Sequence, residues 1–310
     1  MAEERRSADI AVVGSANVDL SITVPELPAA GETVLGGDVL RGSGGKGANQ
    51  AVAAARLGGR VAMIGRVGDD DGGRWLREQL RTDGVDVRAL LTTGDAPTGT
   101  AVIAVDPEGE NTIVVSQGAN ARVSTGDLDA AAAVLGGATI VLTQLEIPLD
   151  VVAKLPGAIT GWAILNPAPA AVGVALDGFD VVVPNRLELA TLAATTPSPD
   201  LAIVADQARS LDTPTVVVTL GPQGAMVVSN DKTSAPAADV VTVPAMPVTP
   251  VDATAAGDSF CGALAVALVE GADVIQAVNW AVRVAGTTVM SRGAQESLPT
   301  RDAVGSWLSG

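Results

Sequence analysis

The chain has 310 residues, 47% of them hydrophobic, which is enough for one large α/β domain with a sizeable core. Its formal net charge of −16 argues against nucleic acids and anionic membranes as partners, because both require dense Lys and Arg surfaces. The chain contains no histidine, which excludes Ser-His-Asp triads, Cys-His pairs and histidine-ligated zinc, so acid–base chemistry falls to Asp, Glu, Lys or Cys.

The apolar runs, such as 131–135 and 139–142, are much shorter than the roughly 18 residues of a membrane span. The first six residues mix charges and lead almost directly into a strand pattern, without the apolar stretch of a signal peptide. The one cysteine, Cys261, cannot form an internal disulfide. These features predict a cytoplasmic protein.

From residue 9 onward, runs rich in β-branched residues alternate with stretches rich in Ala and Leu. The predicted core strands are 9–14, 60–65, 138–142, 161–165, 179–183 and 214–219, followed by a pair at 224–229 and 238–243. The predicted helices are 47–57, 71–82, 124–135, 186–195, 200–211, 257–269, 273–288 and 301–308. Such an alternation is typical of a mostly parallel sheet covered by helices.

Two segments, 20–41 and 86–116, break this alternation with short β-rich pieces that Pro, Gly and polar residues interrupt. No helix is expected in either of them. The predicted strands are 20–24, 33–41, 99–105 and 111–116. Because they lie between core elements, they predict a small sheet inserted into a single domain that spans residues 1–310.

The glycine-rich run 41–50 precedes a strong helical pattern. It is not a Walker A loop, because Leu40 stands at the position of the first glycine and Gly47 follows Lys46 in place of Ser or Thr. Its GxGxxG spacing also allows a dinucleotide site or a plain helix cap, and on the pattern alone these readings stay open. The polar side chains of Lys46 and Asn49 favour a site for a polyhydroxyl ligand.

The segment 14–19 follows the first strand, at the end of the sheet where ligands bind in open α/β folds. In extended backbone Asn17 and Asp19 point the same way, and such a pair can grip vicinal hydroxyls. An ordinary Asx turn explains these two residues about as well.

The segment 251–260 enters an apolar helix through Ala255, Ala256 and Gly257. Small residues there let backbone N–H groups approach an anion, and the helix dipole favours negative charge at the same point. Asp258 lies in the first turn of this helix. The alternative is an acidic helix cap, which seldom needs so small an approach.

Four further segments carry polar residues at strand ends: 144–146, 166–169, 184–188 and 219–224. Each one alone reads as a loop. Together they place polar groups at one edge of the sheet, where a site in this architecture is built.

From about residue 9 to about residue 300 the chain resembles the ribokinase-like (PfkB) carbohydrate kinases. The residues that carry this resemblance are the two signature regions 44–51 and 252–260, supported by 28–33, 144–146, 166–169 and 293–295. The resemblance implies a three-layer αβα core and a β-sheet lid, formed by 20–41 and 86–116, that closes over the sugar and mediates a homodimer.

It also implies roles for individual residues. The positions that match sugar contacts are Asn17, Asp19, Gly45, Lys46, Asn49 and Glu146. Those that match the nucleotide and Mg²⁺ site are Asn185, Glu188, Thr219, Gly221, Gly224 and Gly257. Ala255, Ala256 and Gly257 match the anion hole, and Asp258 matches the general base. The positions that match an activating monovalent cation site, usually K⁺, are Asp252, Thr254, Thr288, Ser291, Gly293 and Ser297.

The implied reaction is transfer of the γ-phosphoryl group of ATP to the primary (5-) hydroxyl of D-ribose. Deoxyribose, another sugar or a nucleoside is the alternative substrate within the family. From other classes, a non-catalytic sugar-binding protein would be expected to lack Asp258, and a dinucleotide-dependent oxidoreductase leaves 252–258 unexplained. The chain departs from the family pattern at Arg186, Ala253, Ala255 and Val282.

Overall fold

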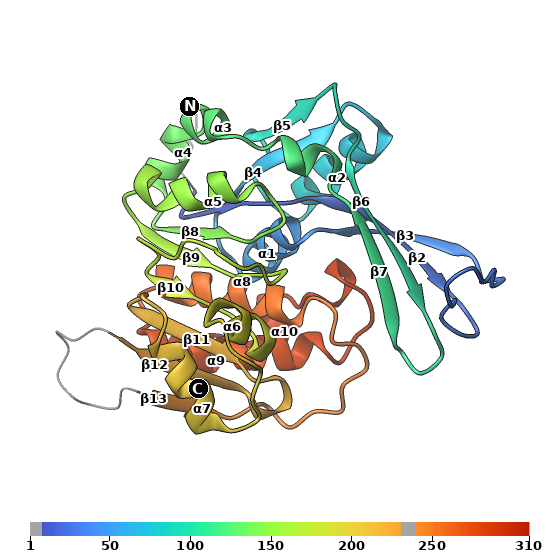
Figure 1. The fold of residues 1–310 in the computed structure, drawn as a ribbon. Helices are drawn as coiled ribbons and strands as arrows, with labels where there is room; N and C mark the ends of the chain where they lie inside the picture. The colour runs from blue at the N-terminus through green and yellow to red at the C-terminus, as the bar shows by residue number, and fades with distance from the viewer. Residues whose placement is uncertain (1–7, 231–239, 310) are drawn as a thin grey trace.

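A computed structural model describes residues 8–230 and 240–309 (Figure 1). Its centre is a nine-stranded sheet in the order β13-β12-β11-β10-β9-β8-β1-β4-β5. The strands are β1 Ile10–Val13, β4 Val61–Gly68, β5 Leu90–Thr93, β8 Ile140–Thr143, β9 Trp162–Leu165, β10 Val181–Val182, β11 Thr215–Thr219, β12 Ala225–Ser229 and β13 Val240–Val243. All neighbours from β11 to β5 pair in parallel, whereas β12 and β13 are antiparallel.

The predicted mostly parallel sheet is therefore confirmed. Each of the predicted core strands corresponds to an observed strand, and residues 238 and 239 of the last one lie outside the described residues. The first strand shows why the sheet needs cover on both sides: Ile10 and Val12 pack into one apolar cluster, while Ala11 and Val13 pack into another. Alternate side chains of a strand point to opposite faces, so both faces of this sheet are buried.

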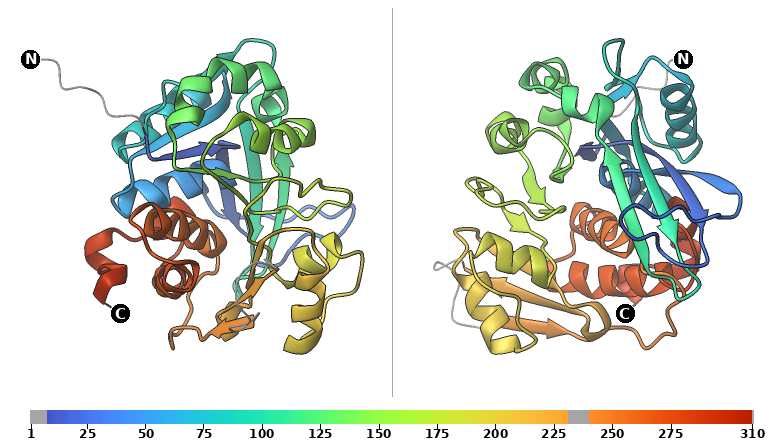
Figure 2. Two further views of the ribbon diagram at one scale, coloured as in Figure 1. Left: turned by 90° about the vertical axis from the view of Figure 1, so that its left-hand side faces the viewer. Right: turned by 45° about the vertical axis from the view of Figure 1, so that its right-hand side comes forward.

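Helices form the outer layers on both faces (Figure 2). One apolar cluster joins the sheet to α1 Lys46–Arg56, α2 Asp71–Thr82, α8 Ala256–Val269 and α9 Val274–Thr288. The clusters on the opposite face involve α3 Thr125–Ala130, α4 Ala132–Gly137, α5 Leu149–Lys154, α6 Arg186–Leu192 and α7 Leu201–Arg209. The order helix, sheet, helix is the predicted three-layer core.

The structure departs from the predicted helices in three places. The stretch 124–135 forms α3 and α4, because Ala131, at φ −94° and ψ 9°, leaves helical geometry between them. The stretch 301–308 ends early, since α10 covers only Arg301–Val304 and Gly305 follows at φ 72°. Helix α5 was not expected, and its six residues are too few for a clear helical period.

A second, four-stranded sheet has the order β3-β2-β6-β7 and projects from the body of the molecule (Figure 1). Its strands are β2 Asn17–Thr23, β3 Val39–Gly44, β6 Gly99–Val105 and β7 Asn111–Ser116. We call it the small sheet. The prediction that all of 86–116 belongs to it needs correction, because β5 pairs in parallel with β4 at the edge of the large sheet. Residues 33–38, expected in a strand, form none, and β2 begins already at Asn17.

Within the described residues, no helix combines the length and the apolar character that crossing a membrane would need.

Candidate active site

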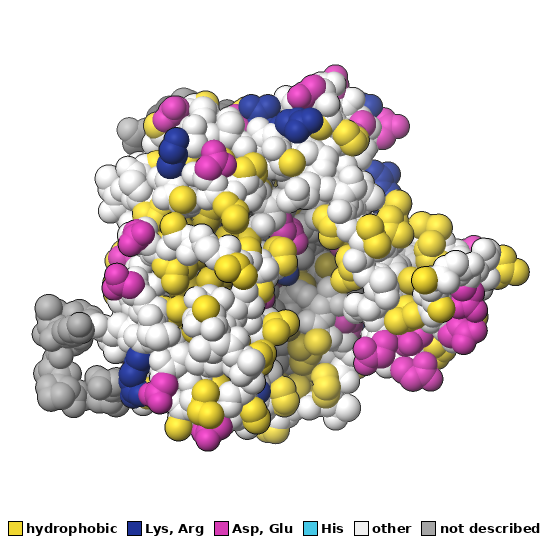
Figure 3. Space-filling model, in the orientation of Figure 1, with side chains coloured by type: hydrophobic (Ala, Val, Ile, Leu, Met, Phe, Trp, Pro, Cys, Tyr) yellow, Lys and Arg dark blue, Asp and Glu magenta, His cyan; other side chains and the backbone are white. Residues whose placement is uncertain are grey.

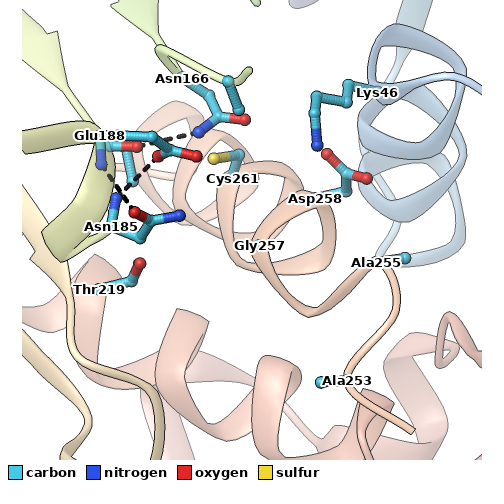
Figure 4. Close-up of a pocket in the computed structure, with 12 residues that line it drawn as sticks. Lys46, Asn166, Asn185, Glu188, Thr219, Ala253, Ala255, Gly257, Asp258 and Cys261 are labelled. Carbon is cyan, nitrogen blue, oxygen red and sulfur yellow. Dashed lines mark hydrogen bonds between the residues drawn. The ribbon is translucent and has the colours of Figure 1, made fainter. Parts of the chain in front are cut away.

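A pocket opens at the carboxyl ends of the parallel strands, beside the N-terminus of α8 (Figure 4). Its polar lining comes from segments that follow β9 and β10, from the last residue of β11, from α1 and from α8. The residues that line it include Lys46, Asn166, Asn185, Glu188, Thr219, Gly257, Asp258 and Cys261. Three of the four polar strand ends that the sequence placed at one edge of the sheet, 166–169, 184–188 and 219–224, therefore meet around this pocket, whereas no residue of 144–146 lines it.

Helix α8 begins after Ala255, which has left-handed backbone at φ 58°. Gly257 and Asp258 follow in its first turn, where N–H groups have no carbonyl of a preceding helical turn to bond. The N–H of Ala256 donates to the carbonyl of Ala253 at 3.3 Å, a long hydrogen bond within the approach loop. The helix dipole and these first-turn N–H groups provide an environment for an anion.

Asp258 is a buried carboxylate of this pocket, with 6% of its surface exposed. Its Oδ2 accepts from Asn49 Nδ2 at 2.9 Å, and its Oδ1 accepts from Gln50 Nε2 at 3.1 Å. Burial raises the pKa of Asp258, and the opposing effects of Lys46, Asn49 and Gln50 reduce that rise. Each oxygen receives one amide N–H, so the carboxylate keeps acceptor capacity for a substrate hydroxyl.

The Lys46 side chain points toward Asp258 (Figure 4). It is the first residue of α1 and follows Gly45, whose φ of 86° is readily available only to glycine. Burial lowers the pKa of the Lys46 ammonium, but the charges of Asp258, Glu146 and Glu188 outweigh it and leave the pKa raised. A persistent positive charge therefore lines the pocket.

Asn17 and Asp19 share one face of β2, as the sequence predicted from their spacing. Asn17 is buried, and its Oδ1 accepts from Asn120 Nδ2 at 2.7 Å. The Asp19 carboxylate lies against Gly44, where an added Cβ would meet Oδ2 at 2.0 Å. Burial, followed by the charges of Glu146, Glu296 and Asp258, raises the pKa of Asp19 to about 7.

Glu146 connects three segments beside the pocket. Its Oε2 accepts from Ser15 Oγ at 2.5 Å and from the backbone N–H of Lys46 at 3.0 Å. These two hydrogen bonds connect the loop after β1 and the start of α1 to the segment that follows β8.

Asn185 and Glu188 form a capping box at the start of α6, and Glu188 Oε2 accepts from the Asn185 N–H at 2.8 Å. Burial raises the pKa of Glu188, while its hydrogen bond to Asn185 opposes that rise. Thr219 is the last residue of β11 and forms an isolated parallel β-bridge with Asn185. Gly221 and Gly224, at φ 61° and 91°, shape the turn that follows. The predicted nucleotide residues thus lie side by side.

The predicted cation loops also meet. Asp252 accepts from the Thr254 N–H and the Gly293 N–H, both at 2.9 Å, and thereby joins the two loops. Two of the other residues predicted for the cation site use their hydroxyl groups in hydrogen bonds with neighbouring residues. Thr288 Oγ1 donates to Ser259 Oγ at 2.8 Å, and Ser297 Oγ donates to the Ala294 carbonyl at 2.8 Å. Ser291, the remaining predicted residue, is exposed. Carboxylate, hydroxyl and carbonyl oxygens suit a hard cation, so the loop pair fits K⁺ chiefly through Asp252 and backbone carbonyls.

Sequence reasoning missed four amide side chains that hydrogen-bond to Asp258 or to its amide partners: Gln50, Gln144, Asn166 and Gln295. All are buried. All four lie in segments that the sequence analysis noted for other reasons, and Gln50 directly follows Asn49 on α1. A buried amide amid small and apolar residues was the available signal, since such groups require partners. Glu296, whose charge acts on Asp19, was also missed.

Comparison with known proteins agrees with this geometry. Residues 7–301 match the model of the pfkB family carbohydrate kinases. The chain is 40% identical to the ribokinase of Bacillus subtilis over 97% of this chain and 99% of that one. It is 35% identical to a deoxyribokinase of Salmonella typhi, over 97% and 99% of the two chains.

Among solved structures, Arabidopsis thaliana ribokinase complexed with ribose and ATP is 30% identical, with a TM-score of 0.85 over 96% of this chain and 97% of that chain. The family match spans both sheets and every element that lines the pocket. The chain belongs to the pfkB family of carbohydrate kinases.

Proposed function

We propose that this carbohydrate kinase transfers the γ-phosphoryl group of ATP to the primary 5-hydroxyl of D-ribose, with Asp258 as general base. One observation carries the proposal: a buried carboxylate lies in the first turn of α8, held by two amide side chains and facing Lys46. The relatives named ribokinase, one of them in complex with ribose and ATP, support ribose as the sugar.

In this mechanism Asp258 accepts the proton of the attacking hydroxyl as the hydroxyl oxygen meets the γ-phosphorus in line. First-turn N–H groups of α8 and the ammonium of Lys46 stabilise the charge on the transferred phosphoryl oxygens. On the other side of the site, Asn17, Asp19, Asn49 and Glu146 would orient the sugar.

Mg²⁺ bound with ATP would neutralise phosphate charge, and Asn185 and Glu188 are the residues that would hold it. Mg²⁺ usually takes one or two carboxylates, with phosphates and waters completing its shell. The Glu188 side chain fits this role because it lies at the pocket and its capping bond uses Oε2. Thr219, Gly221 and Gly224 would border the nucleotide. K⁺ between the loops of Asp252 and Gly293 would stabilise the backbone of the loop that leads into α8.

The second candidate is a deoxyribokinase, which the relative of that name favours. The two sugars differ by one hydroxyl. A site that hydrogen-bonds that hydroxyl discriminates strongly, because the loss of the hydroxyl leaves buried polar groups unpaired. Values of kcat/KM for ribose, 2-deoxyribose, other sugars and nucleosides separate these functions, and a preference of at least tenfold for ribose is expected.

The small sheet would serve as a lid over the sugar and as the dimer contact. It projects beside the site, and the surface is hollowed between this sheet and the body of the molecule (Figure 3). Its strand β2 carries Asp19, so movement of the sheet would change the sugar site directly. Closure would keep water away from the phosphoryl group.

The decisive experiment is Asp258→Asn. Turnover should be abolished while sugar affinity by calorimetry stays within about tenfold, because the substitution removes the base and keeps the shape of the side chain. Asp302→Asn is the matched control, since Asp302 also lies in a first helical turn, that of α10, but is exposed. The proposal would fail if Asp258→Asn kept more than about 10% of kcat. It would also fail if the variant were less stable but fully active, because Asp258 would then serve only to cap the helix.

A further inference from the structure

Two glutamine side chains connect the end of β8 to Asp258. Gln144 follows β8, and its Nε2 donates to Gln50 Oε1 at 2.7 Å. Gln50 Nε2 then donates to Asp258 Oδ1 and to Asn166 Oδ1, both at 3.1 Å. Both glutamines have 0% of their surface exposed, so neither can touch a substrate.

A parallel chain of bonds reaches the other oxygen of the same carboxylate. Gln295 Nε2 donates to Asn49 Oδ1 at 3.2 Å, and Asn49 Nδ2 donates to Asp258 Oδ2 at 2.9 Å. Each oxygen of Asp258 is therefore held by an amide that is itself held by a second amide. Both series of hydrogen bonds begin outside α8, so side chains from other parts of the fold hold the Asp258 carboxylate in place.

The ionised carboxylate determines the direction of these bonds. A carboxylate only accepts, so Gln50 must turn its NH₂ group toward Asp258 and its Oε1 toward Gln144. Gln144 must then turn its own NH₂ group toward Gln50 Oε1. This orientation leaves Gln144 Oε1 buried without a hydrogen-bond partner among the described residues.

We propose that Gln50 and Gln144 form a positioning relay that fixes the orientation of the Asp258 carboxylate and favours its ionised form. The inference rests on the proposed function, in which Asp258 is the base. Gln50 would act on the reaction through its bond to Asp258: a donor to the charged form stabilises it, and a fixed carboxylate meets the sugar hydroxyl in one geometry.

Other titratable groups around Asp258 also affect its proton equilibrium. They come from β2, α1, the end of β8, α6 and α8, and they are Asp19, Lys46, Glu146, Glu188 and Cys261. Substitutions of Gln50 and Gln144 leave all of these groups in place. A change in the pH profile of such variants would therefore report on the relay itself.

The experiment compares Gln50→Met, Gln144→Met and Gln207→Met, since methionine is unbranched and close to glutamine in size. Gln207 is the matched control: it is also buried and also donates twice from Nε2, to Thr195 Oγ1 and the Thr196 carbonyl, but on α7. For each variant we measure kcat, the KM for sugar, the pH profile of kcat/KM and the melting temperature.

We expect Gln50→Met to lower kcat about tenfold or more with little change in the KM for sugar, because only the alignment of the base is lost. The acid limb of its pH profile should move to higher pH, since Asp258 loses a donor to its ionised form. Gln144→Met should show a smaller loss with a displacement in the same direction. Gln207→Met should change the melting temperature alone.

Wild-type kcat and pH profile in a folded Gln50→Met would overturn the relay while leaving Asp258 as the base. If Gln50→Met does not fold, an unchanged profile in Gln144→Met would overturn it equally. Substantial activity in Asp258→Asn would instead overturn the proposed function. A drop in kcat without any shift of the acid limb would assign the glutamines to packing and would also contradict the inference.

Discussion

Asp19 combines an elevated pKa with a position on the proposed sugar side of the site. Burial and the charges of Glu146, Glu296 and Asp258 raise its pKa to about 7, so near neutrality the carboxyl is partly protonated. An ionised carboxylate accepts two sugar hydroxyls, whereas a protonated one accepts fewer. Sugar affinity should therefore rise as the pH is raised through about 7.

Calorimetric titration with ribose between pH 6 and 8 checks this expectation. Asp19→Asn should weaken sugar binding, remove the pH dependence and leave ATP affinity nearly unchanged, because the lost acceptor leaves sugar donors unpaired. Glu296→Gln should move the pH dependence to lower values by removing one of the repelling charges. A collapse of ATP affinity in Asp19→Asn would show that the sugar-site assignment is wrong.

At the scale of single elements, the start of α8 stores backbone strain. Ala255 has φ 58°, which costs an alanine about 1 kcal/mol and a glycine far less. Ala255→Gly should raise the free energy of unfolding by about 1 kcal/mol, as measured by urea denaturation, with kcat retained.

Ala194 offers a matched control, since it is also left-handed, at φ 52°, just beyond α6 and outside the pocket. Ala194→Gly should stabilise the protein by a similar amount. Should only Ala194→Gly be stabilising, the local backbone at Ala255 would not be the strained element described above.

The loops of Asp252 and Gly293 carry the prediction about K⁺. Their hydrogen bond lies next to the approach to α8, so a cation held there would order the N–H groups without contacting the substrate. Turnover with Mg²⁺ and ATP should rise several-fold when K⁺ replaces tetramethylammonium at constant ionic strength, because a preorganised anion site can supply about 3 kcal/mol. Na⁺ should serve less well.

Asp252→Ala should abolish this activation. Its shared hydrogen bonds to Thr254 and Gly293 would be lost as well, so the melting temperature is measured alongside. Equal rates in K⁺ and tetramethylammonium, together with an active Asp252→Ala, would show that the chain does not use the ion.

At the scale of the whole molecule, the small sheet exposes apolar side chains on both of its faces. Ile113 and Val114 are neighbours on β7 and point to opposite faces, with 52% and 66% of their surfaces exposed. Val102, paired with Val114, and Leu40 extend the apolar surface. Exposed apolar side chains on the faces of a sheet are typical of a protein interface.

We expect a homodimer in sedimentation velocity and a monomer for the double variant Ile113→Asp/Val114→Asp, since buried, unpaired carboxylates oppose association. Val172→Asp is the control, because Val172 is 82% exposed but lies outside the small sheet. A monomeric wild-type protein, or a dimeric double variant, would contradict the proposed role of this sheet in assembly.

The sequence by itself determined the alternating core, the two signature regions and the position of Asp258 at a helix start. These are local features: the period of apolar residues, glycines such as Gly45 and a helix N-terminus depend on neighbours in the chain. The placement of Asn17 and Asp19 on one side followed from the two-residue period of extended backbone.

Only the tertiary structure decided which groups meet across long stretches of chain. Gln50 and Asp258 are 208 residues apart, and no local pattern joins them. The same holds for the position of β5 at the edge of the large sheet and for the charge of Glu296 near Asp19. Such contacts depend on how whole elements pack, because the chain between them is long enough to allow many arrangements.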